Sequence, residues 1–287
     1  MRWNRGPMSE NVEDMRGQSG GRGPGGGLRL GLGGMLLLLI LSIVFKRDFF
    51  SLIGGGDGMQ AGAPGAALSP EAQAHEDSLA SLVSAVLDSA QGEWAAVFPR
   101  LGAQYRPAKL VLFRDAIQSA CGFAESATGP FYCPGDEKVY IDLGFYDELT
   151  SRFGAAGDFA EAYVLAHELG HHVQNLLGIE QQVRQAQQRR PESRNDLSVR
   201  MELQADCFAG VWGADYQAKG GLDAGDLEEG MRAAAAVGDD RIQKMAQGYV
   251  NPEGFTHGSS AQRERWFRQG FDTRDPKQCD TFAARQL

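Results

Sequence analysis

Apolar residues are arranged in two different ways along this chain of 287 residues. Between residues 28 and 45 they form a nearly continuous run, interrupted by Arg29. From about residue 71 onward they recur at the spacings of helices and strands. Those spacings predict helices over 71–88, 158–177, 196–216 and 260–271, and strands at 109–113 and 138–143. We therefore predict a mainly helical α+β domain with a small sheet over residues 71–287.

The apolar run at residues 28–45 has the composition of a membrane-spanning helix. It is short for a full span, but basic residues at its ends can snorkel and extend its reach. Arginines are frequent before it, and the positive-inside rule then keeps the N-terminus in the cytoplasm. This predicts a disordered cytoplasmic tail over 1–27, a transmembrane signal anchor over 28–45, a flexible linker over 46–70, and a periplasmic or extracellular domain. A cleaved signal peptide is the alternative, although its candidate site at 61–63 lies far beyond the apolar run.

The predicted helix that begins at Asp158 contains the motif H-E-x-x-H, in which His167 and His171 flank Glu168. Residues four apart lie on one face of an α-helix, so the two imidazoles can point at one position. Glu168 is the next residue around the helix and can reach a water held there. Two histidine ligands and a glutamate base are the zinc metalloprotease arrangement. His172 points about 100° away from His171, and we interpret it as a packing or surface histidine.

A catalytic zinc has three protein ligands and one position for water, so the two histidines need a partner. The best candidate is Glu202, on the predicted helix over 196–216. Asp206 lies four residues further on the same face, where it can accept the free N–H of a ligand imidazole. The alternative is two solvated carboxylates, but their apolar neighbours make unpaired carboxylates costly. The sequence therefore predicts Zn²⁺ bound by His167, His171 and Glu202, with Asp206 supporting a histidine.

Composition and cysteine content indicate the class of protein, its partners and its disulfides. The hydrophobic fraction of 43% and charged fraction of 23% are those of a globular protein, and the net charge of −9 argues against a nucleic-acid partner. Four cysteines in an exported domain suggest disulfides, for which three pairings exist. We favour Cys121–Cys133, which closes a local loop, and Cys207–Cys279, which ties the tail to the core. A metal role is the alternative for Cys207, but zinc-ribbon spacing is absent.

The motif together with Glu202 and Asp206 resembles the gluzincin class of metallopeptidases, whose best-known member is thermolysin. Longer stretches resemble a bacterial family, the membrane-anchored putative neutral zinc metallopeptidases. These stretches are 129–134, 140–143, 157–160, 167–174, 202–207, 238–243 and 255–258. The resemblance implies a zincin-like fold, a zinc cofactor and peptidase activity. It also implies that His257 belongs to the late histidine-bearing loop that stabilises the tetrahedral oxyanion.

His257 lies in a predicted loop, where functional residues are often found. A capping role for the helix over 260–271 is an equally good interpretation, and Arg263 is a second candidate for the oxyanion. We expect Asp239 and Asp240 to cap a helix or pair with Arg241 rather than to bind calcium.

These residues predict a membrane-tethered zinc metalloendopeptidase that acts on peptides or unfolded proteins. Glu168 takes a proton from the attacking water and passes it to the leaving amine. The strand over 139–143 pairs with an extended substrate, as an edge strand can. The alternative is a non-catalytic binding or chaperone-like module at the membrane, in which zinc only stabilises the fold. Glu168 argues against this alternative, because a structural zinc site is closed by four protein ligands and needs no base.

Overall fold

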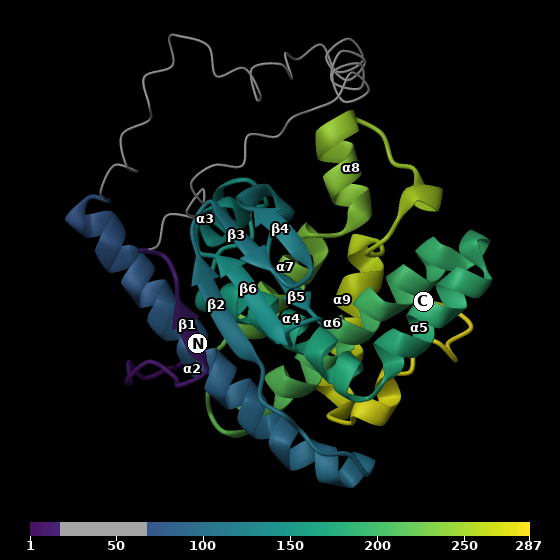
Figure 1. Ribbon diagram of the computed structural model, residues 1–287, viewed down its shortest axis with the longest axis horizontal. Helices are drawn as coiled ribbons and strands as arrows, with labels where there is room; N and C mark the ends of the chain where they lie inside the picture. Colours follow the sequence, from purple (N-terminus) through teal and green to yellow (C-terminus); the bar gives the residue numbers. More distant parts are fainter. Residues whose placement is uncertain (18–67) are drawn as a thin grey trace. The chain divides into compact units, whose positions relative to one another are not determined.

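The computed structural model describes residues 1–17 and 68–287, and residues 1–17 belong to the same unit as residues 70–287 (Figure 1). The strands are β1 (Val12–Asp14), β2 (Lys109–Phe113), β3 (Ala116–Ser119), β4 (Gly122–Glu125), β5 (Phe131–Cys133) and β6 (Lys138–Asp142). The α-helices are α2 (Pro70–Val97), α3 (Gly144–Ser151), α4 (Asp158–Leu176), α5 (Ile179–Arg189), α6 (Arg194–Ala218), α7 (Asp226–Ala236), α8 (Asp239–Gln247) and α9 (Ser260–Thr273). Short 3-10 helices are η2 (Phe98–Leu101), η3 (Ser126–Thr128), η4 (Pro191–Ser193), η5 (Pro252–Gly254) and η6 (Pro276–Cys279). The predicted mainly helical α+β class with a small sheet is confirmed.

Four strands form one sheet in the order β1-β2-β6-β5, and β3 and β4 form a separate hairpin. Strands β1, β2 and β6 are parallel, whereas β5 runs antiparallel to β6. Alternate residues of β2 enter different parts of the core, as the two-residue period of a strand requires. Leu110 and Leu112 join the main cluster with the helices, whereas Val111 and Phe113 pack with Tyr140. Because both faces are covered, β2 is apolar at consecutive positions.

The sheet order corrects one prediction. Strand β6, which we expected to pair with a substrate, lies between β2 and β5 and has no free edge. The strand at that edge of the sheet is β5, only three residues long. A sequence pattern of period two shows which residues face the core, but it does not show the order of strands across a sheet.

Helix α4 connects the sheet with the helical half of the domain. It contacts strands β5 and β6 and packs against helices α2, α6 and α7 (Figure 1). Its crossing with α6 is close because Gly170 has no side chain. A Cβ atom at Gly170 would lie 2.9 Å from the backbone oxygen of Ala205. The glycine inside the H-E-L-G-H sequence therefore lets α6 approach the histidines.

Two disulfides join separate elements of the fold. Cys207 on α6 is bonded to Cys279, which ties the last residues of the chain to the helical core. Cys121 is bonded to Cys133, which ties the turn of the β3–β4 hairpin to the end of β5. These are the two pairings that the sequence analysis favoured.

The N-terminal residues differ from the expected disordered tail. Strand β1 pairs in parallel with β2, and the backbone N–H of Leu110 donates to Asn11. Polar contacts hold the segment further, because the hydroxyl of Ser9 donates to Asp88 at 2.5 Å and Lys138 forms an ion pair with Glu13 at 2.7 Å. A composition poor in apolar residues suggested disorder, but these contacts come from residues far along the chain. The domain therefore includes residues 1–17.

The predicted location of the protein is also corrected. Within residues 1–17 and 68–287, no helix combines the length and apolar character needed to cross a membrane. The expected anchor at 28–45 lies outside the described residues. A single span there would place β1 and β2 on opposite sides of a membrane, whereas the two strands are hydrogen bonded in one sheet. The expected topology, with a cytoplasmic N-terminus and an exported domain, is therefore wrong.

Candidate metal centre

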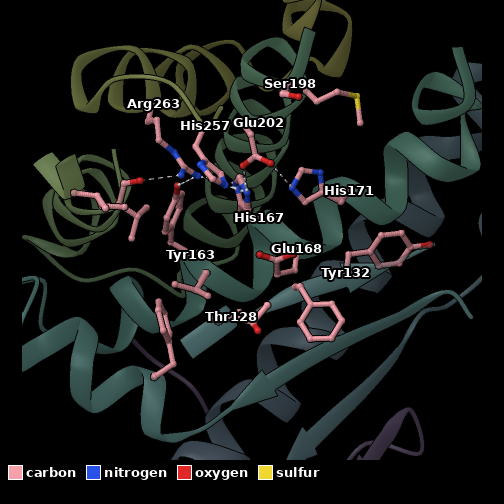
Figure 2. Close-up of a pocket in the computed structure, with 18 of the residues that line it drawn as sticks. Thr128, Tyr132, Tyr163, His167, Glu168, His171, Ser198, Glu202, His257 and Arg263 are labelled. Carbon is pink, nitrogen blue, oxygen red and sulfur yellow. Dashed lines mark hydrogen bonds and ion pairs between the residues drawn. The ribbon is translucent and has the colours of Figure 1, made fainter. Parts of the chain in front are cut away.

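The motif histidines line a cleft of about 860 Å³ between the sheet and the helices (Figure 2). Strand β5 and helices α3, α4, α5 and α6 each contribute side chains to its walls. The loop before α9 adds His257, and α9 itself adds Arg263. The cleft therefore brings together residues that are more than a hundred positions apart in the sequence.

The three predicted metal ligands converge inside the cleft. One ligand atom from each of His167, His171 and Glu202 lies within 4.8 Å of the other two. The Nε2 atom of His167 is 3.2 Å from the Glu202 carboxylate, and that of His171 is 3.4 Å from the other carboxylate oxygen. Figure 2 shows the carboxylate reaching down from α6 toward both rings.

Hydrogen bonds orient both histidines in the same way. The Nδ1 of His167 donates to Asp206 at 2.8 Å, and the Nδ1 of His171 donates to Gln174 Oε1, also at 2.8 Å. The amide of Gln174 has a fixed orientation, because its nitrogen donates to the backbone oxygen of Met201. With both Nδ1 atoms acting as donors, each Nε2 keeps its lone pair for the space beside Glu202.

Asp206 is the centre of a buried network of charges. It is 0% exposed, and it accepts two hydrogen bonds of 2.9 Å from Arg263 and a further one from the hydroxyl of Tyr163. Burial would raise the pKa of Asp206, but Arg263 and His167 outweigh it and lower that pKa. Burial lowers the pKa of His167, yet Asp206 and Glu202 raise it to about 9. In the absence of a metal, a proton therefore competes for the same nitrogen.

This donor set fits a divalent metal of the zinc type. Two imidazole nitrogens, each supported by a hydrogen bond at its Nδ1, and a carboxylate are the ligands of a catalytic zinc with one position left for water. Glu168 is a further acidic residue of the cleft, which comes from α4 and is 8% exposed. Across the described residues, its carboxylate has neither an ion pair nor a side-chain hydrogen bond. Figure 2 shows it beside the two histidines.

His257 enters the cleft from the loop before α9. Its Nδ1 lies 3.1 Å from Asp239, and this hydrogen bond raises the pKa of the imidazole. The other oxygen of Asp239 accepts the backbone N–H groups of Thr256, His257 and Gly258. The capping role considered for His257 belongs instead to Ser259, whose side chain accepts from the backbone N–H of Gln262.

Several residues of the cleft were missed or assigned differently from the sequence. Gln174 follows His171 by three residues, a helical spacing that could have identified it. Asp239 holds the His257 loop instead of pairing with Arg241, which donates to the backbone oxygen of Phe153. The polar helix α5 also contributes side chains to the cleft, and the sequence analysis assigned them no role. These side chains are Glu180, Val183, Arg184 and Gln187.

Comparisons with known proteins agree with this geometry. The model of the family described as "Putative neutral zinc metallopeptidase" matches residues 1–282. The chain is 49% identical to the uncharacterized protein YpfJ of Escherichia coli K12, over 98% of this chain and 99% of that protein. It is 44% identical to the uncharacterized protein Rv2575 of Mycobacterium tuberculosis H37Rv, over 71% of each. No solved structure matches the chain. The chain thus belongs to the putative neutral zinc metallopeptidase family.

Proposed function

We propose that this protein is a zinc-dependent endopeptidase that hydrolyses bonds within extended or unfolded chains. The observation that carries the proposal is the carboxylate of Glu168, which has no partner among residues 1–17 and 68–287 and lies buried in the cleft beside a converging pair of histidines and Glu202. A buried carboxylate without a partner is costly, so its retention at this place indicates a role in chemistry.

In this proposal, each residue of the cleft has a separate role in hydrolysis. His167, His171 and Glu202 would hold the zinc ion, which supplies Lewis acidity and lowers the pKa of a water molecule. Glu168 takes a proton from the attacking water and delivers it to the leaving nitrogen. The imidazole of His257, held by Asp239, donates a hydrogen bond to the developing oxyanion. Arg263 is engaged by Asp206, so His257 is the better donor.

The substrate strand in this proposal pairs with β5. Its residues Phe131 and Tyr132 line the cleft, as do the flanking Gly129, Pro130 and Pro134. Among the described residues, β5 pairs with β6 alone, so in this proposal its other edge adds an extended peptide. An extended, unfolded segment presents the backbone groups that such pairing needs.

The test compares the zinc-loaded full chain with its Glu168→Gln variant at equal zinc content, using a mixture of unfolded peptides. We expect the parent to cleave and the variant to lose about 10²-fold or more in rate, because general base catalysis is worth that much. A His257→Gln arm should lose about 10²-fold in kcat with zinc retained. The matched control is Glu148→Gln, which changes an exposed glutamate of the same cleft and should cleave like the parent.

Equal cleavage by the parent and Glu168→Gln would show that Glu168 is not the base. No cleavage by either would favour the alternative of a binding module in which zinc only stabilises the fold. Mass spectrometry of the products reads both outcomes directly.

A further inference from the structure

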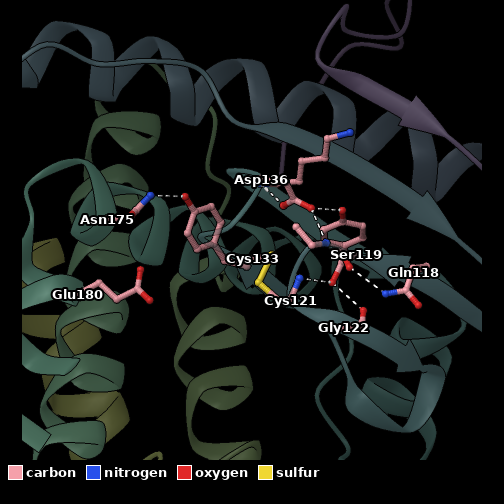
Figure 3. Close-up of a disulfide and its surroundings, with 12 residues drawn as sticks. Gln118, Ser119, Cys121, Gly122, Cys133, Asp136, Asn175 and Glu180 are labelled. Atoms are coloured by element: carbon pink, nitrogen blue, oxygen red, sulfur yellow. Dashed lines mark hydrogen bonds between the residues drawn. A yellow bond between two sulfur atoms is a disulfide. The ribbon is translucent and has the colours of Figure 1, made fainter. Parts of the chain in front are cut away.

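Three side chains join strand β5 to the metal-site helix through hydrogen bonds. The hydroxyl of Tyr132 on β5 lies 3.0 Å from Nδ1 of His172 and accepts a hydrogen bond of 2.9 Å from the amide of Asn175. The Nε2 of His172 lies 2.6 Å from the backbone oxygen of Arg106. We call Tyr132, His172 and Asn175 the strand clamp. Figure 3 shows the Asn175 contact near Cys133.

The donors and acceptors of the strand clamp allow one arrangement of hydrogen bonds around a neutral His172. The backbone oxygen of Arg106 can only accept, so Nε2 of His172 carries the hydrogen and Nδ1 accepts. The Tyr132 hydroxyl then donates to His172 and receives the Asn175 amide. His172 is 0% exposed, and its ring is edge-on to those of Tyr105 and Tyr132. A partly buried set in which the hydroxyl and both ring nitrogens are hydrogen bonded fixes orientation more strongly than packing alone.

Two residues of the strand clamp, His172 and Asn175, come from the same helix as two metal ligands. His172 follows His171 directly, and Asn175 lies three residues further, so α4 directs one face at the metal position and another at β5. Strand β5 is short, and within the part of the chain that the structure describes it has a partner strand on one side only. Its distance from the metal position therefore depends on links beyond the ladder to β6. The strand clamp is such a link on the α4 side, and the Cys121–Cys133 disulfide is another on the hairpin side.

We propose that the strand clamp sets which bond of a bound peptide lies beside Glu168, by fixing β5 relative to α4. This inference rests on the proposed peptidase function. Figure 2 shows Tyr132 extending away from the metal-ligand residues, so we assign it a positioning role. A misplacement of about 1 Å can cost a reaction about 10²-fold, and a strand advances about 3.3 Å per residue. A loosened β5 therefore affects both the rate and the choice of bond.

The test is Tyr132→Phe in the zinc-loaded full chain, which keeps the ring and removes the hydroxyl. We expect kcat/KM for an extended peptide to fall about 10-fold, mainly through KM, because the peptide pairs with a less fixed strand. We also expect new cuts at bonds next to the parent site, read by mass spectrometry. The matched control is Tyr140→Phe on β6, which removes a hydroxyl that donates to Asp136 at 2.7 Å. It should keep the parent's sites and KM.

A second readout does not depend on turnover. In the zinc-loaded Glu168→Gln background, Tyr132→Phe should weaken the binding of the same peptide about 10-fold, and Tyr140→Phe should not. If Tyr132→Phe fails to fold, Asn175→Ala removes one donor from a partly exposed position and should show the same trend. Unchanged sites, KM and peptide affinity in a folded clamp variant would overturn the inference. If the parent binds the peptide but does not cut it, the peptidase proposal fails, and the affinities still decide whether the strand clamp positions β5.

Discussion

Helix α4 has carboxylates around it in two places, near its start and around its metal ligands, which we call its metal end. The surroundings shift the pKa values of these carboxylates in opposite directions. Near its start, Glu161 is partly buried, and its pKa is raised to about 7 by burial and by the nearby Asp158, Asp147 and Glu229. Around His167, the buried carboxylate of Asp206 instead meets Arg263 and an imidazole, and its pKa is lowered. A perturbed pKa is therefore not by itself a sign of function, since Glu161 is not among the residues that line the cleft.

The comparison shows how the surroundings of carboxylates differ between a metal site and a place with no such site. Near the start of α4, the acids around Glu161 repel one another, and protonation of Glu161 relieves that repulsion. At the metal end, the buried charge of Asp206 is paired with Arg263 and an imidazole, and hydrogen bonds direct two Nε2 atoms toward Glu202. Glu168 is the exception, since its carboxylate has no such partner among the described residues. Breaking such a network by removing one member leaves the other charge buried and unpaired, which is expensive. The predictions below therefore differ in size and in sign between the two ends of α4.

The largest effect is expected from Asp206→Asn at the metal end. The change keeps the shape of the side chain but leaves Arg263, which is 4% exposed, without its counter-charge. We expect the free energy of unfolding to fall by about 3–5 kcal/mol, measured by urea denaturation at neutral pH. The control is Asp196→Asn on the same helix, which breaks an exposed ion pair with Arg200 and should cost less than about 1 kcal/mol. Equal losses in the two variants would contradict the special position of Asp206.

A smaller effect is expected from Gln174→Met. Gln174 is 0% exposed and accepts the Nδ1 hydrogen of His171, so methionine leaves that imidazole free to turn. We expect zinc affinity to fall about 10- to 100-fold, measured by competition with a chelator on protein shown to be folded by circular dichroism. The control is Gln187→Met, since Gln187 lines the cleft but bonds to Ser198 and not to a histidine. If both variants bind zinc as the parent does, the Gln174 hydrogen bond does not orient the ligand.

The metal centre was more predictable from the sequence than its surroundings, for a physical reason. His167 and His171 share a face through helical spacing alone, and Asp206 follows Glu202 by the same rule. That the two helices meet depends on Gly170 lying against Ala205, a contact that no periodicity encodes.

Other features had no local pattern to reveal them. Asp239 and His257 are 18 residues apart and meet through a loop. Strand β1 lies in a polar stretch and depends on β2, which is almost a hundred residues away. The interior place of β6 in the sheet likewise depends on which strands flank it. Each of these features is set by long-range packing.

The smallest effect, and one of opposite sign, is expected from Glu161→Gln at the start of α4. Because the folded-state pKa of Glu161, about 7, lies above its ordinary value of 4.5, the folded protein holds this proton more tightly than the unfolded chain. Glu161 therefore costs nothing below about pH 4.5 and destabilises the fold increasingly as the pH rises through 7. Glutamine resembles the protonated acid, so the variant should be more stable than the parent by about 1 kcal/mol at pH 8 and equal to it near pH 4, since solvent screens a partly exposed group.

The control for this prediction is Glu228→Gln, an exposed glutamate in the first turn of α7. Both glutamates lie where a negative charge favours a helix, so the control removes that favourable effect from the comparison. Thermal unfolding of the parent and both variants at pH 4, 6 and 8 is the measurement. A Glu161→Gln variant that is less stable than Glu228→Gln at pH 8 would mean that the acids around the start of α4 are compensated after all. Both places along α4 would then have compensated carboxylates, and they would differ only in which residues compensate them.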